Sequence, residues 1–131
     1  MTKNDWLELT VLERKKYNCL LEVEDVTRQL AEALDRNDQV AAQMLVALRQ
    51  DPLLQLEEVD RGEKQRKAGL PEEDLDRLRI LLRDREARYD GESAFLEQAG
   101  KTRKLLERVV ELDRRISLRM AGDHSFYGKK K

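Results

Sequence analysis

Cysteine, histidine and glycine are scarce in this sequence, and each scarcity excludes a class of site. The only cysteine, Cys19, cannot form a disulfide within the chain, which fits a reducing compartment such as the cytosol. We expect it to lie in or beside a helix core, because free cysteines are commonly buried. The only histidine, His124, cannot supply a two-histidine zinc site, and the isolated glycines form no phosphate-binding loop.

Long apolar runs and an excess of one charge are also missing. The longest stretch without a charge is far shorter than the roughly 18 apolar residues that a membrane-spanning helix requires. The first residues, MTKNDWLELT, lack the pattern of a signal peptide. The formal net charge is -1, so the charge balance does not favour nucleic acid or an anionic lipid surface. We therefore expect a cytoplasmic protein that neither inserts into a membrane nor binds nucleic acid.

No arrangement of residues predicts catalysis. The carboxylates have neither the spacing of a calcium-binding loop nor that of an HExxH zinc motif. Asp123, His124 and Ser125 are residue types found in catalytic triads, but three consecutive residues cannot align as nucleophile, base and orienting group. The sequence therefore predicts a protein that is not an enzyme and that has no cofactor and no metal site.

Charge is the most abundant feature of the sequence. Asp, Glu, Lys and Arg make up 40% of the residues, compared with about 25% in an ordinary domain. Acidic residues precede basic ones by four positions along much of the chain, as at Glu24/Arg28 and Glu111/Arg115, and such pairs stabilise a solvated helix. The period-two alternation of strands is missing. The sequence predicts an all-α fold, an elongated up-and-down bundle of three to four long antiparallel helices.

Apolar residues at three- and four-residue steps predict where the first two helices lie. The first is expected to begin at Asn4 or Asp5, which are good N-cap residues, and to end near residues 35–38. The second begins there and keeps its apolar phase across Asp-Pro at 51–52, which favours a kink rather than a full break. Its apolar residues run out before Gly69, where we expect it to end.

The third predicted helix is the longest. It begins near Pro71, has a weak or bent point near residues 90–91, and ends at Gly122, a plausible C-cap. Residues 1–122 would then form a single helical bundle domain. Four leucine and valine residues on its apolar phase are expected in the core: Leu78, Leu82, Leu106 and Val109.

Residues 123–131 are predicted to be a flexible C-terminal tail that carries two adjacent aromatic residues, Phe126 and Tyr127. Burying an aromatic side chain stabilises by several kcal/mol at about 25 cal/mol per Å², while ordering the connecting backbone costs about 1–2 kcal/mol per residue. Because the two nearly cancel, the rings would either fold back on the last helix, help to hold a partner helix there, or stay in a disordered tail.

Two segments of the chain resemble the FlgN-type flagellar export chaperones. The pattern L--AL-RND--A--ML--L--D-LL-L, read from Leu30 to Leu56, resembles their first helical pair and, more loosely, that of FliT. The stretch 102–128 resembles their final helix and tail, in which a helix with paired leucines precedes a tyrosine-glycine. The matching residues are Leu105, Leu106, Tyr127 and Gly128.

The resemblance implies a cytosolic chaperone that binds the amphipathic C-terminal helices of flagellar hook-associated proteins and keeps them soluble before type III export. The partner helix would lie along the last helix and under the tail. The residues expected to contact it are Leu105, Leu106, Val109, Leu112, Ile116, Phe126 and Tyr127. The periodicity leaves an alternative open, a self-associating coiled-coil structural or adaptor protein with no client, and a homodimer is compatible with either function.

Overall fold

Five helices make up the fold, and no strand occurs in the described backbone, residues 1–129. In this computed structural model the side chains of residues 1–121 are described. The helices are α1 (Lys3–Asp35), α2 (Gln39–Leu48), α3 (Gln50–Ala68), α4 (Glu72–Asp84) and α5 (Glu92–Lys129). The prediction of an all-α bundle is confirmed.

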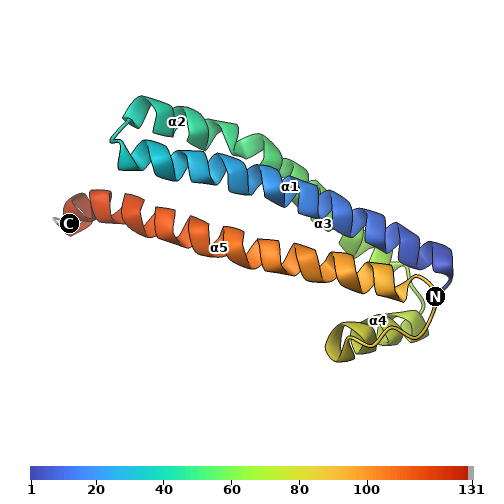
Figure 1. The fold of residues 1–131 in the computed structure, drawn as a ribbon. Helices are drawn as coiled ribbons and strands as arrows, with labels where there is room; N and C mark the ends of the chain where they lie inside the picture. Colours follow the sequence, from blue (N-terminus) through green and yellow to red (C-terminus); the bar gives the residue numbers. More distant parts are fainter. Residues whose placement is uncertain (130–131) are drawn as a thin grey trace.

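α1 lies at the centre of an elongated bundle (Figure 1). α2 and α3 run back along one side of α1, and α5 runs parallel to α1 along another side. α3 and α5 both pack on α1 but make little direct contact with each other. The short α4 lies beside the start of α5, at the end of the bundle that holds the N-terminus. The bundle therefore consists of three long rods in up-down-up order and one short helix.

α1 begins earlier than Asn4 or Asp5, the residues predicted to cap it. The N-cap is Thr2, whose hydroxyl accepts a hydrogen bond from the backbone N–H of Asp5, while the Asp5 carboxylate accepts one from the N–H of Thr2. This reciprocal capping box satisfies two donors that a helix start otherwise leaves unpaired. Asp5 therefore lies inside the helix, in its first turn.

The junction between α2 and α3 is a kink, as predicted. Only Arg49 separates the two helices, and its backbone remains in the helical region, with φ −68° and ψ −21°. Pro52 lies in the first turn of α3, where its missing N–H costs no helical hydrogen bond. The predicted outer boundaries are also confirmed, because Asp38 caps α2 and Gly69 ends α3.

The weak point predicted near residues 90–91 lies where the helix is interrupted, but the interruption is a full break and not a bend, because the chain leaves the helical path over residues 85–91. Arg85 ends α4 in the left-handed region, with φ 60°, and Gly91 precedes α5 with φ 90°. The side chain of Glu92 is fully buried beneath this loop and accepts hydrogen bonds from the backbone N–H groups of Arg88 and Tyr89. The buried carboxylate thus organises the loop.

α5 is also longer than predicted, because its helical backbone continues past Gly122 to Lys129. Gly122 is therefore not the end of the helix. The side chains of Phe126 and Tyr127 lie outside the described residues, so the role predicted for these rings, and the flexibility predicted for 123–131, stay predictions.

Three apolar clusters follow α1 from one end to the other. The first joins α1 to α4 and α5 and contains two aromatic rings whose centroids are 5.3 Å apart. Cys19 is buried, as predicted. The buried members of the clusters are Trp6, Leu9, Leu78, Leu81 and Phe95 in the first, Leu20, Val23, Leu105 and Val109 in the second, and Leu30, Ala33, Ala42 and Ile116 in the third.

Two of the four predicted core residues are buried and two are exposed. Leu78 and Val109 lie in the core, as predicted. Leu82 and Leu106 are 41% and 38% exposed, so their predicted burial is wrong. α4 and α5 are each covered mainly on one side, and only the leucine nearer to that side, Leu81 or Leu105, can be buried.

Candidate functional site

Most of the α5 residues predicted to contact a partner helix already pack against the protein's own α1. Leu105 and Val109 are buried in the cluster that includes Leu20 of α1, and Ile116 is buried in the next cluster. Leu112 is half-buried beside that cluster. A partner could reach these residues only after α1 had separated from α5. Of the predicted residues on α5 with described side chains, Leu106 alone is exposed.

A different apolar surface is open near the N-terminal end of α1. Leu7 is 58% exposed, and Val11, one turn further along the helix, is exposed as well. Both side chains lie on the side of α1 away from Trp6 and Leu9, which face the core. We call the surface formed by Leu7 and Val11 the α1 ridge. Its two residues lie four positions apart, the spacing of anchors in helix–helix contacts.

A groove of about 410 Å³ lies on one flank of the α1 ridge. Leu7 and Thr10 of α1 form one wall, and Gly91 and Ala94 at the start of α5 form the other. The Thr10 hydroxyl donates to the backbone carbonyl of Trp6 at 2.7 Å, so its polar group is satisfied within the helix. The groove therefore offers an apolar surface, with Lys3 and Asn4 of the first helical turn lining its outer part.

The wall of this groove depends on the absence of a side chain at Gly91. A Cβ atom at this position would lie 2.8 Å from the Cβ of Trp6, which is closer than side-chain atoms approach one another. Gly91 also has a φ of 90°, in the region that favours glycine. The loop before α5 can therefore close directly onto α1.

A second groove, of about 380 Å³, lies on the other flank of the α1 ridge. Leu7 lines this groove too, together with Val11 and Leu12. Glu8 and Arg66 supply its charged lining, and Arg66 comes from the end of α3. Leu7 therefore separates two apolar grooves, one shared between α1 and α5 and the other between α1 and α3.

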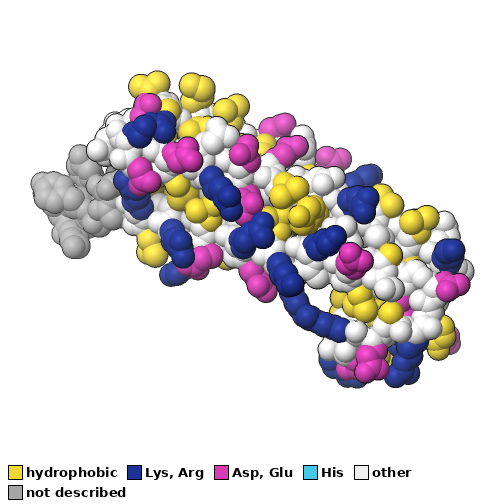
Figure 2. Space-filling view, in the orientation of Figure 1, with side chains coloured by type: hydrophobic (Ala, Val, Ile, Leu, Met, Phe, Trp, Pro, Cys, Tyr) yellow, Lys and Arg dark blue, Asp and Glu magenta, His cyan; other side chains and the backbone are white. Residues whose placement is uncertain are grey.

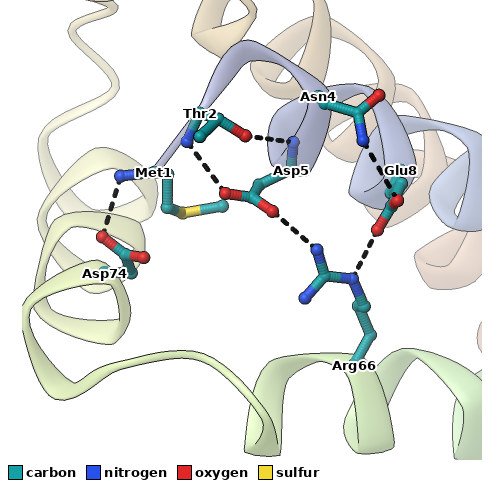
Figure 3. A network of polar contacts seen from close by, with 7 residues as sticks. All are labelled: Met1, Thr2, Asn4, Asp5, Glu8, Arg66 and Asp74. Atoms are coloured by element: carbon teal, nitrogen blue, oxygen red, sulfur yellow. Dashed lines mark hydrogen bonds and ion pairs between the residues drawn. The ribbon is translucent and has the colours of Figure 1, made fainter.

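A polar network fixes the first turns of α1 around these grooves (Figure 3). The Arg66 guanidinium donates from Nε to Glu8 at 2.6 Å and from Nη2 to Asp5 at 2.7 Å. The amino group of Met1 donates to the carboxylate of Asp74 in α4 at 2.8 Å. Because these contacts tie α1 to both α3 and α4, the α1 ridge is held on a rigid frame.

The hydrogen bonds of the network favour the charged forms of Asp5 and Arg66. Hydrogen bonds from the backbone N–H and the hydroxyl of Thr2, followed by the bond from Arg66, lower the pKa of Asp5. Hydrogen bonds to Glu8 and then to Asp5 raise the pKa of Arg66. The grooves are thus apolar inside and bordered by paired charges, the composition of a protein-binding surface with a hydrophobic centre and a polar rim.

Apolar side chains supply most of the exposed lining of both grooves. Within the described part of the chain, no group of three or more His, Cys, Asp or Glu side chains could hold a metal ion. No described helix combines the length and the apolar character that crossing a membrane requires. A ridge between two apolar grooves matches the knobs-into-holes packing of one helix on another.

No family model, curated protein or solved structure matches this chain in the three comparisons made. The resemblance to FlgN-type chaperones therefore stays a prediction. The sequence-based prediction did not include the α1 ridge, although the pattern of apolar residues in α1 indicates it. Leu7 and Val11 are apolar residues off the phase of Trp6, Leu9 and Leu20, which indicates a second apolar face on the same helix.

Proposed function

We propose that the protein binds an amphipathic helix of a partner protein at the α1 ridge and acts as a cytosolic export chaperone for that partner. The observation that carries this proposal is that Leu7 lines both apolar grooves. An incoming helix with anchors three or four residues apart can insert one anchor into each groove. Leu7 would then fill the space between the anchors, as a knob fills a hole.

The rigid frame supports binding of a helix over binding of an irregular chain. The network around Arg66 and Asp5 holds α1 in place, so the surface needs little reordering when a partner arrives. A helix presents its anchors in an equally fixed arrangement. The charged groups at the edge, Lys3 on one side and Glu8 with Arg66 on the other, can meet the polar face of the partner helix.

The export part of the proposal is supported by the resemblance to FlgN-type chaperones and by the partner chemistry. Before an amphipathic helix is incorporated into an assembly, its apolar face is exposed to solvent, and this exposure promotes aggregation. Covering this face keeps the client soluble until export. The client would be a hook-associated protein, through its C-terminal helix. We propose the α1 ridge as the contact surface in place of the face of α5, because α1 covers that face.

The test compares two exposed leucines. Leu7→Asp places a charge between the grooves, whereas Leu118→Asp changes a side chain of almost the same exposure, 59% against 58%, on α5. We expect Leu7→Asp to weaken binding of a labelled C-terminal peptide from a hook-associated protein by at least about tenfold, measured by fluorescence anisotropy. Leu118→Asp should leave the affinity unchanged.

Two results would contradict the proposal. If the Leu7→Asp variant bound the peptide with the same affinity as the original protein, the α1 ridge would not be the binding surface. Failure of the original protein to bind any such peptide would remove the export-chaperone assignment. Circular dichroism of both variants should be unchanged, because both side chains are exposed.

A further inference from the structure

α2 is the one helix of the described structure that contains no charged residue. Its sequence is QVAAQMLVAL, within a chain of which 40% is charged. Ala42 is its only buried residue, so most of this uncharged helix meets solvent. A helix of this composition is typical of a buried position, whereas a solvated helix usually carries charge on its outer face.

The outer face of α2 is lined by large apolar side chains at helical spacing. Val40 is 75% exposed and Met44 is 58% exposed, and Ala47 and Leu48 continue the face at the next turn. Apolar side chains project from the region of α2 in the upper left of the space-filling view (Figure 2). We call this surface the α2 face. It lies at the end of the bundle opposite to the α1 ridge.

We propose that the α2 face binds the α2 face of a second copy of this chain, with the two helices antiparallel about a two-fold axis. The face is nearly symmetric about Met44, because Val40 lies four residues before it and Leu48 four residues after it. In the antiparallel pair, Met44 of one copy meets Met44 of the other, and Val40 meets Leu48. The same apolar surface thus serves both copies, as a two-fold interface requires.

The charges that flank the α2 face are complementary in this arrangement. Arg36 lies just before α2 and Asp51 just after it, and both are exposed. Both side chains are therefore open to a second copy, although Asp51 also accepts a hydrogen bond from Gln55 on its own helix. Antiparallel packing brings Arg36 of each copy beside Asp51 of the other. A parallel pair would instead place like charges together, which is unfavourable.

The small size of the α2 face predicts a weak dimer. Ten residues of helix extend over about 15 Å, so the pair buries less than the roughly 1,200–2,000 Å² of a stable protein interface. We therefore expect a dissociation constant in the micromolar range and an equilibrium between monomer and dimer. Because the α1 ridge lies at the other end of the bundle, each copy of the dimer can still bind a partner helix.

Sedimentation velocity of the full chain over a range of concentrations tests the proposal. The original protein should change from monomer to dimer between about 1 and about 200 µM. Met44→Glu should remain monomeric throughout, because it places two like charges at the centre of the interface. Leu118→Glu, which changes a side chain of similar exposure on α5, should dimerise as the original does.

The orientation is tested by exchanging the flanking charges. Arg36→Asp and Asp51→Arg should each weaken the dimer several-fold, and the double variant should recover the original dissociation constant. A monomer at all concentrations would overturn the proposal. If the Met44→Glu variant still formed a dimer, the interface would lie elsewhere. If the single charge variants had no effect, or if the double variant did not recover the original dissociation constant, the antiparallel arrangement would be excluded.

The same variants separate this proposal from the function proposed for the α1 ridge. Met44→Glu should bind the peptide of a hook-associated protein with unchanged affinity. Leu7→Asp should dimerise with an unchanged dissociation constant. Each proposal can therefore fail while the other stands.

Discussion

The guanidinium of Arg77 donates two hydrogen bonds to the buried carboxylate of Glu92, from Nε at 2.7 Å and from Nη2 at 2.6 Å. The same carboxylate accepts from the backbone N–H of Arg88 at 2.8 Å. Arg77 belongs to α4 and Glu92 is the first residue of α5, so one carboxylate fixes the two helices and the loop between them. The wall of the groove at Gly91 is adjacent to this carboxylate.

The first prediction is that Glu92→Gln destabilises the protein by about 3 kcal/mol, because it leaves the Arg77 guanidinium without its buried partner. Chemical denaturation measures the change. Glu97→Gln is the control, since Glu97 pairs with Lys101 on the surface of the same helix and should cost less than about 1 kcal/mol. Similar losses for the two variants would contradict this account of the α4–α5 junction.

The pH dependence offers a second measurement on Glu92. The hydrogen bonds from Arg77, and then those from the loop N–H groups, lower the pKa of Glu92 from 4.5 to about 2. Because the folded pKa is below the unfolded one, the stabilisation is fully present above about pH 4.5 and is lost as the pH falls through about 2. The stability of Glu92→Gln should fall less steeply over this interval than that of the original protein.

The second prediction concerns Glu13, which lies buried between α1 and α3 beside Glu63. Burial, and then the charge of Glu63, raise the pKa of Glu13 above its usual 4.5. Its contribution to stability is therefore full below about pH 4.5 and is lost as the pH rises through the raised pKa. Glu13→Gln removes that loss, so we expect this variant to be more stable than the original at pH 7.

Thermal denaturation at several pH values measures this effect. The difference between Glu13→Gln and the original should shrink as the pH is lowered toward 4. Glu22→Gln, on the exposed side of α1, is the control and should show no such trend. If Glu13→Gln were less stable than the original protein at pH 7, the folded protein would favour the charged form of Glu13. That result would contradict the raised pKa of Glu13.

The third prediction concerns Gly91. Gly91→Ala should destabilise the protein by at least about 1 kcal/mol, because alanine is strained at a φ of 90° and its Cβ meets Trp6 at 2.8 Å. Gly100→Ala is a matched control inside α5, where a Cβ meets nothing within 4 Å. It should stabilise by about 0.5–1 kcal/mol through better helix propensity. Denaturation curves that show the same sign for both variants would contradict this.

The fourth prediction separates two adjacent leucines of α5. Leu105→Ala should cost about 2–5 kcal/mol, since Leu105 is buried in the cluster around Leu20. Leu106→Ala should cost much less because its side chain is 38% exposed. Urea denaturation of the two variants measures the difference. Equal costs would indicate that Leu106 is covered in solution, for example by a second chain.

The helix ends that were predicted correctly depend on single residues acting on their own backbone. Asp38 caps α2, Gly69 ends α3 and Pro71 precedes α4. Each effect is local, so the sequence contains all the information that fixes it. The break at residues 85–91 is different, because it depends on a contact between Arg77 and Glu92, which lie 15 positions apart and could not meet within one continuous helix.

The candidate site could not be located from periodicity because a helix can carry two apolar faces. The sequence identified the face of α5 with Leu105 and Val109 correctly as apolar, but periodicity does not reveal whether α1 or a partner covers it. Leu7 and Val11 remain exposed because α3 and α5 pack on other sides of α1. Which face stays free is a property of the assembled bundle.

The parallel pairing of α1 with α5 has a consequence for the order of folding. Arg108 and Glu24 meet across 84 positions of the chain, whereas α1 and α2 are joined by a short turn and can associate at once. Contacts between distant segments form slowly because closing a long loop costs entropy. The hairpin of α1 with α2 and α3 should therefore form first, and the apolar side of α1 around Trp6 and Leu20 remains partly uncovered in the nascent chain until α4 and α5 have been synthesised and have docked.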